Sequence, residues 1–264
     1  MLLTAILALT LSILLPLAYI RLTRIRLYKN IESKTLPQLL SANRTITIAN
    51  TNIPPFTDRL AVLQNFLAES TLTSLLSTVH NLQHERGFVP AMRKGGAISF
   101  ESIIKNVPLL VSLYYDTGFQ RQISSIVGTQ IYPTPLRDQT SLSLLCYTEE
   151  GDHINWHYDY NFYKGRLFTV LLTLLNNGGN INALSHAMLM MKLKGEQTVI
   201  PTPANSLVVF ESNYLCHRVT QLKEGESRIV ISMTYCTNSE ASFLQNVTRR
   251  FKDTAFYGIR ALWA

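Results

Sequence analysis

The second half of the chain is a series of short apolar runs, each about the length of one β-strand. The runs are Ser141–Thr148, Leu167–Asn176, Ala187–Lys194, Gln197–Ile200, Ser206–Glu211, His217–Leu222 and Arg228–Cys236. Turn-forming pieces such as Asn176–Asn180, Pro201–Pro203 and Lys223–Gly225 separate them. Short apolar runs bounded by turn signals predict strands, so this half is expected to form a β-sheet.

The first half has a different pattern, in which apolar residues recur at helical spacing. Ala68–Leu82, Ile98–Val107 and Ser112–Val127 are expected to be helices, and Gly128 ends the last of them. Helices followed by strands in one compact chain favour an α+β fold in which the helices pack outside a sheet sandwich.

One strand-like segment carries a histidine and a carboxylate two residues apart. Side chains two apart on a strand point to the same side, so His157 and Asp159 face one point. With a third ligand from another strand they would form the two-histidine, one-carboxylate site of non-haem Fe(II) oxygenases. His217, soon after the run that ends at Phe210, is the predicted third ligand. Arg228, eleven residues later, opens another strand and can grip a carboxylate with its planar fork.

This order resembles that of the 2-oxoglutarate and Fe(II)-dependent dioxygenases: His-x-Asp, a histidine about sixty residues on, then an arginine about ten further. The chain is most similar to their prolyl 4-hydroxylase-like catalytic domains, from Phe56 to Cys236. The resemblance implies a double-stranded β-helix, or jelly roll. It also implies Fe(II) and 2-oxoglutarate as cofactors and O2 as a partner, and it allows ascorbate as a reductant.

The resemblance also assigns roles to individual residues. Arg228 is expected to bind the C5 carboxylate of 2-oxoglutarate, and Tyr147, in a Tyr-x-x-x-Gly lead-in, to donate to the same molecule. Thr169, in an Arg-x-x-Thr at the head of the next strand, is expected to line that pocket. The predicted metal ligands, which form the catalytic centre, are His157, Asp159 and His217.

The implied reaction hydroxylates an unactivated C–H bond and releases succinate and CO2 from 2-oxoglutarate. Related halogenases lack the metal-binding carboxylate, so Asp159 favours hydroxylation or another oxygenase outcome. Arg228 stands where collagen-type prolyl hydroxylases carry lysine, which leaves the substrate open between a small organic molecule, a lipid and a protein. The alternative is a non-catalytic, cupin-like ligand- or metal-binding protein tethered to a membrane.

Composition narrows the class of partner. Charged residues make up 16% of the chain and hydrophobic residues 47%, as in a packed domain rather than a disordered one. The net charge is +7, but no nucleic-acid-binding motif accompanies it, so a nucleic-acid partner is not expected. The three cysteines form no CxxC pattern and are expected to be core residues.

Segments near the two ends of the chain suggest attachment to a membrane. Leu2–Ile20 contains no charged residue and is long enough to cross a bilayer as a helix. Basic residues at positions 21, 24, 26 and 29 follow it, which favours a single-pass anchor with the main domain in the cytoplasm. Residues 241–264 predict a basic amphipathic helix that either lies on the membrane or docks on the domain. The expected order is a membrane anchor with its basic flank (1–29), a linker (30–55), the dioxygenase domain (56–240) and this C-terminal helix (241–264).

Overall fold

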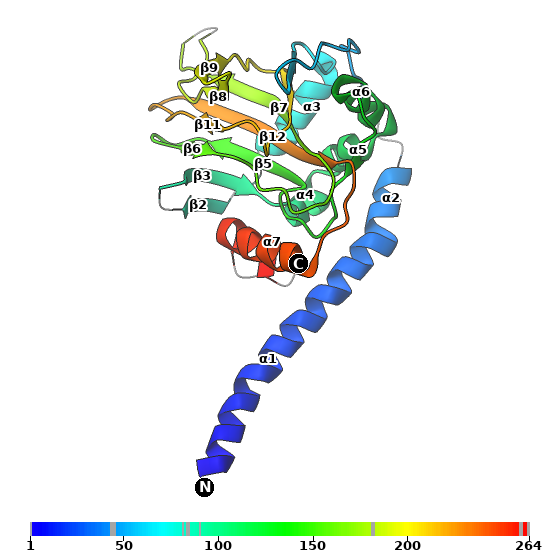
Figure 1. Ribbon diagram of the computed structural model, residues 1–264, viewed down its shortest axis with the longest axis vertical. Helices are drawn as coiled ribbons and strands as arrows, with labels where there is room; N and C mark the ends of the chain where they lie inside the picture. The colour runs from blue at the N-terminus through cyan, green and yellow to red at the C-terminus, as the bar shows by residue number, and fades with distance from the viewer. Residues whose placement is uncertain are drawn as a thin grey trace.

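The computed structural model describes residues 2–42, 46–80, 82, 85–89, 91–180, 183–258 and 261–262. Positions 43–45 of the expected linker, and 259, 260, 263 and 264 of the expected C-terminal helix, lie outside the described residues. A long helix, α1 (Leu2–Asn30), projects from a body made of a sheet and shorter helices (Figure 1).

The described strands form one antiparallel sheet in the order β1-β10-β7-β12-β5-β3-β6-β11-β8-β9, with β2 beside β3 and β4 beside β12. They are β1 (Leu60–Leu63), β2 (Glu85–Val89), β3 (Arg93–Ile98), β4 (Tyr132–Pro133), β5 (Leu142–Tyr147), β6 (His153–His157), β7 (Leu167–Asn177), β8 (Leu189–Leu193), β9 (Glu196–Ile200), β10 (Leu207–Phe210), β11 (His217–Val219) and β12 (Ser227–Cys236). Leu171 of β7 and Leu189 of β8 share one buried cluster although their strands lie far apart in this order. The sheet therefore curls on itself, as the jelly-roll expectation requires.

The two faces of the sheet bury different sets of residues, and β12 shows how the sequence separates them. Ile229, Ile231 and Met233 belong to the main core beneath the helices. Arg228 and Val230, which alternate with them, line a cavity on the concave face. Alternation along this one strand therefore directs its side chains to two different environments.

Four helices cover the outer face: α3 (Glu69–His80), α4 (Phe100–Asn106), α5 (Pro108–Tyr115) and α6 (Thr117–Val127). The single helix expected over 112–127 is wrong, because Asp116 is extended and its carboxylate caps α6 by accepting from the backbone N–H of Phe119 at 2.6 Å. Gly128 ends α6 in the left-handed conformation, with a φ of 70°.

Two further segments differ from the sequence expectation. The expected linker is helical over its first part, because a π-helical turn (Ile31–Thr35) and α2 (Leu36–Ser41) continue α1. Tyr28 and Ile31 are buried in the main core, so this end of the helix packs against the body. The hairpin of β2 and β3 was not expected, since its charged, glycine-rich sequence shows no apolar alternation.

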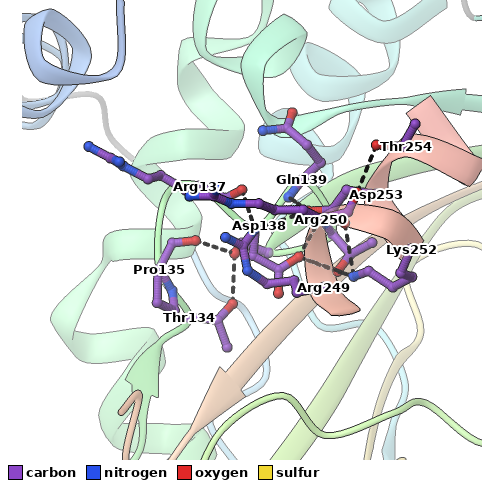
Figure 2. A network of polar contacts seen from close by, with 12 residues as sticks. Thr134, Pro135, Arg137, Asp138, Gln139, Arg249, Arg250, Lys252, Asp253 and Thr254 are labelled. Carbon is purple, nitrogen blue, oxygen red and sulfur yellow. Dashed lines mark hydrogen bonds and ion pairs between the residues drawn. The ribbon is translucent and has the colours of Figure 1, made fainter. Parts of the chain in front are cut away.

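The C-terminal helix α7 (Phe243–Tyr257) docks on the body through a buried cluster of four charged side chains (Figure 2). Lys252 Nζ lies 3.3 Å from Asp138 Oδ1 and 3.0 Å from Asp253 Oδ1, and Arg249 Nη1 lies 3.1 Å from Asp253 Oδ2. Burial alone would raise the pKa of Asp138, but Lys252 and Arg249 outweigh it and lower that pKa to about 2. The sequence left open whether this helix lies on a membrane or docks on the domain, and in the structure it docks on the domain.

Among the helices of the described residues, none combines the length and the unbroken apolarity needed to cross a membrane. The expected transmembrane helix gains no support from the structure.

Replacing Lys252 with methionine is expected to lower the free energy of unfolding by about 3–5 kcal/mol, because two buried carboxylates would lose their shared cation. Urea denaturation of the purified chain measures this loss. Lys164→Met is the matched control: its partner is Glu240, both side chains are exposed, and little change is expected. Equal losses in the two variants would contradict the anchoring role of the cluster.

Candidate metal centre

Three side chains from two strands and the segment after one of them meet at one point of the concave face. His157 of β6 pairs directly with His217 of β11, and the centres of their rings lie 4.1 Å apart. Asp159 Oδ1 lies 3.7 Å from His157 Nε2 and 4.0 Å from His217 Nε2. One ligand atom from each residue falls within 4.8 Å of the others, close enough to bind one ion.

Hydrogen bonds hold both imidazoles in the form that a metal requires. His157 Nδ1 lies 2.8 Å from the carbonyl oxygen of Asn155, and His217 Nδ1 lies 2.9 Å from that of Leu215. A carbonyl oxygen can only accept, so each Nδ1 carries the proton and donates it. Each Nε2 therefore keeps its lone pair on the side of Asp159, and a metal can bind there.

The protonation states also suit a metal. Burial lowers the pKa of His217 to about 4, so this ring is neutral at physiological pH. Burial alone would raise the pKa of Asp159, but His217, His157 and the Thr169 hydroxyl favour the ionised form and lower it. Thr169 Oγ1 donates to Asp159 Oδ2 at 2.7 Å, which fixes the orientation of the carboxylate.

A second group of polar side chains lies deeper on the same face. Arg228 is 1% exposed, and its Nη2 donates to Thr202 Oγ1 at 3.3 Å. Its Nε, the Tyr147 hydroxyl and Thr173 Oγ1 are all buried and have no hydrogen-bond partner among the described residues. Burial raises the pKa of Tyr147, so its hydroxyl stays protonated and can donate. Buried donors of this kind need an acceptor, and the set fits the distal carboxylate of a keto acid.

A cavity of about 230 Å³ joins the two groups. Both metal-side histidines line it together with Arg228 and Tyr147. Most of the other lining residues are apolar or aromatic, so a bound molecule would be shielded from water. The residues present therefore fit one metal ion and a chelating dicarboxylate side by side.

All six residues singled out from the sequence line this one cavity, Thr169 among them as expected. Thr169 pairs with Thr234, six residues along β12 from Arg228, which is roughly 20 Å of strand. It therefore supports Asp159 and does not reach the group around Arg228. Thr202, in the segment between β9 and β10, was not singled out from the sequence, because its burial depends on the fold.

The family model that matches this chain describes the 2OG-Fe(II) oxygenase superfamily and covers residues 142–235. All six predicted site residues fall inside that range. A comparison with curated proteins finds no match.

Several solved structures share the fold. A prolyl hydroxylase from Trichoplax adhaerens, in complex with a hypoxia inducible factor oxygen degradation domain peptide fragment, has 21% identity over 69% of this chain and 84% of its own, with a TM-score of 0.54. A 2OG-Fe(II) oxygenase family oxidoreductase from Burkholderia pseudomallei has 13% identity over 71% and 89%, with a TM-score of 0.56. The epimerase SnoN, in complex with Fe3+, alpha ketoglutarate and nogalamycin RO, has 10% identity over 76% and 83%, with a TM-score of 0.55.

The family model agrees with the resemblance inferred from the sequence, and these structures share its fold. The ligand set of His157, Asp159 and His217 and the buried Arg228 fit Fe(II) and 2-oxoglutarate.

Thr169→Val is expected to weaken metal binding roughly 10- to 100-fold, because Asp159 loses the hydroxyl that orients it. Titration with Mn(II), followed by electron paramagnetic resonance, gives the affinity. Thr173→Val on the same strand is the matched control. It is expected to leave metal affinity unchanged and to weaken 2-oxoglutarate binding instead, since Thr173 pairs with Val230, two residues from Arg228. Identical metal affinities in wild type and Thr169→Val would contradict this division of roles.

Proposed function

We infer that this chain, whose residues 142–235 match the model of the 2OG-Fe(II) oxygenase superfamily, is an enzyme that hydroxylates an unactivated C–H bond. The observation that carries the proposal is one cavity that holds both a facial set of metal ligands and a buried arginine suited to a keto acid. Asp159 supports hydroxylation, because a carboxylate occupies the position that chloride takes in halogenases.

Each residue has a stated task in this reaction. His157, Asp159 and His217 hold the metal from one side and leave the cavity side open. Bound Fe(II) and 2-oxoglutarate supply the chemistry: O2 is consumed, the substrate gains a hydroxyl, and succinate and CO2 leave. Arg228 binds the C5 carboxylate, and the Tyr147 hydroxyl donates to the same molecule.

The metal-binding protein without catalysis is the weaker candidate. A metal-binding role alone explains the three ligands. It does not explain why Arg228 is buried on the same face with no carboxylate partner among the described residues. The buried arginine is what favours an enzyme that uses a dicarboxylate.

The substrate does not follow from the fold. A prolyl hydroxylase bound to a peptide fragment and an epimerase bound to nogalamycin RO share this architecture. Function lies in the site and its surroundings, so the substrate class has to be argued from the side chains around the cavity.

A membrane location is a separate proposal, with the catalytic domain on the cytoplasmic side. It rests on the charge-free run over 2–20, on the basic residues after it, and on the exposed apolar side chains of α1, which include Leu14 (59%) and Leu15 (63%). Deleting residues 2–20 is expected to move the chain from the membrane pellet to the supernatant after cell fractionation. An unchanged distribution would count against the anchor.

Arg228→Met is expected to weaken 2-oxoglutarate binding roughly 100-fold or more, because a buried carboxylate would lose its charged partner. Calorimetric titration of the Mn(II)-loaded chain measures this affinity. Lys94→Met, which removes a charge outside the cavity, is the control and should bind 2-oxoglutarate like wild type.

Iron-loaded wild type is expected to convert 2-oxoglutarate to succinate, and a chelator is expected to stop the conversion. His157→Ala should be inactive, since two ligands remain where three are needed. Succinate measured by mass spectrometry is the readout. Equal release by wild type and His157→Ala would refute the proposed oxygenase.

A further inference from the structure

A second buried arginine lines the cavity, and neither cofactor accounts for it. Arg93 opens β3 and is 5% exposed. Among the described residues its guanidinium makes one hydrogen bond, from Nη2 to the carbonyl oxygen of Gly96 at 2.8 Å. Its Cζ lies 5.7 Å from the ring centre of Phe256 on α7. The other N–H groups of this cation remain available to a molecule in the cavity.

No carboxylate among the described residues lies within 4.0 Å of the Arg93 guanidinium. Asp152, on the neighbouring turn, is already bound by Arg86 at 2.5 Å and 3.2 Å and by two backbone N–H groups. Burial keeps the nearby Cys146 and Tyr147 neutral by raising their pKa values. Arg93 is therefore a buried positive charge that none of these groups neutralises.

The carboxylates that line the cavity within the described residues are Asp138 and Asp159. Asp138 is held by Lys252, and Asp159 is a predicted metal ligand. Ferrous iron and Arg228 together carry three positive charges, which Asp159 and doubly charged 2-oxoglutarate would balance. Arg93 is then the cation left over in the loaded cavity.

Lys252, the other cation of the cavity, is a poorer candidate for binding a ligand. Its ammonium group already contacts three acceptors, at 3.3 Å from Asp138 Oδ1, 3.0 Å from Asp253 Oδ1 and 2.7 Å from Thr140 Oγ1. An ammonium has three donors, so none is left over.

We propose that Arg93 determines substrate specificity by binding an anionic group, a carboxylate or a phosphate, of the molecule that is oxidised. This proposal rests on the proposed oxygenase function. The planar fork of arginine matches either anion, and Phe256 and Tyr257 of α7 add an aromatic wall to the same cavity. The substrate class is thus an organic anion whose apolar part lies along aromatic walls while its charge meets Arg93.

The test uses the full chain loaded with Mn(II) and saturating 2-oxoglutarate, so that binding is measured without turnover. The probes are phenylpropanoate and phenylbutanoate, the matching phenylalkyl phosphates, and the neutral amides of the two acids. Calorimetric titration gives each affinity, and a separate titration gives the affinity for 2-oxoglutarate. Comparing the acids with the phosphates tells which anion the site prefers.

Wild type is expected to bind at least one anionic probe roughly tenfold or more tightly than its amide. Arg93→Gln should weaken that probe roughly 10- to 100-fold and leave the amides and 2-oxoglutarate unchanged, since only a charged hydrogen bond is lost. Lys94→Gln is the matched control, with the same change of charge one residue away and outside the cavity lining. Arg93→Lys keeps the charge and should keep most of the preference.

If no anion binds better than its amide, or if Arg93→Gln weakens acids and amides alike, the proposal is overturned. Should Arg93→Gln fail to fold, the preference of wild type and its retention in Arg93→Lys decide the question. Failure of the proposed oxygenase function would give another result: 2-oxoglutarate would bind equally to wild type and Arg228→Met.

Discussion

The site depends on one cross-strand pair, His157 of β6 directly opposite His217 of β11. The register shifts immediately afterwards: Ile154 pairs with Val219, so two residues of β6, Asn155 and Trp156, lie opposite one residue of β11, Arg218. With strict alternation Ile154 and His157 would point to opposite faces, yet both line the cavity. This bulge lets β6 contribute two inward side chains three residues apart, and it lies next to the site, where bulges often re-aim side chains.

Three cationic side chains line the cavity within the described residues, and they differ in whether a carboxylate of the protein neutralises them. Lys252 is neutralised within the protein by Asp138 and Asp253. Arg228 and Arg93 have no carboxylate neighbour within 4.0 Å among the described residues. A buried guanidinium stays charged, so these two positions suit anionic ligands, while Lys252 has a structural task.

Elements remote from the metal ligands in sequence connect the cavity to the outer parts of the molecule. The α7 helix supplies Lys252, Phe256 and Tyr257 to the cavity lining and is anchored by the ionic cluster (Figure 2). Gln139, next to Asp138 in that cluster, donates to the hydroxyl of Tyr28 near the end of α1 at 2.6 Å. The end of the N-terminal helix, the loop around Asp138 and the C-terminal helix are therefore connected by buried polar contacts on this side of the cavity.

Alternation along one strand was enough to predict that His157 and Asp159 point the same way, while the resemblance to a family implied the metal and its co-substrate. Alternation gave no sign of the hydrogen bond by which Thr169 supports Asp159, nor of Arg93, whose strand has no apolar alternation. The physical reason is that local periodicity sets the side of a strand to which a residue points. Its neighbours on that side depend on strand order, register and bulges, which contacts between segments distant in sequence decide.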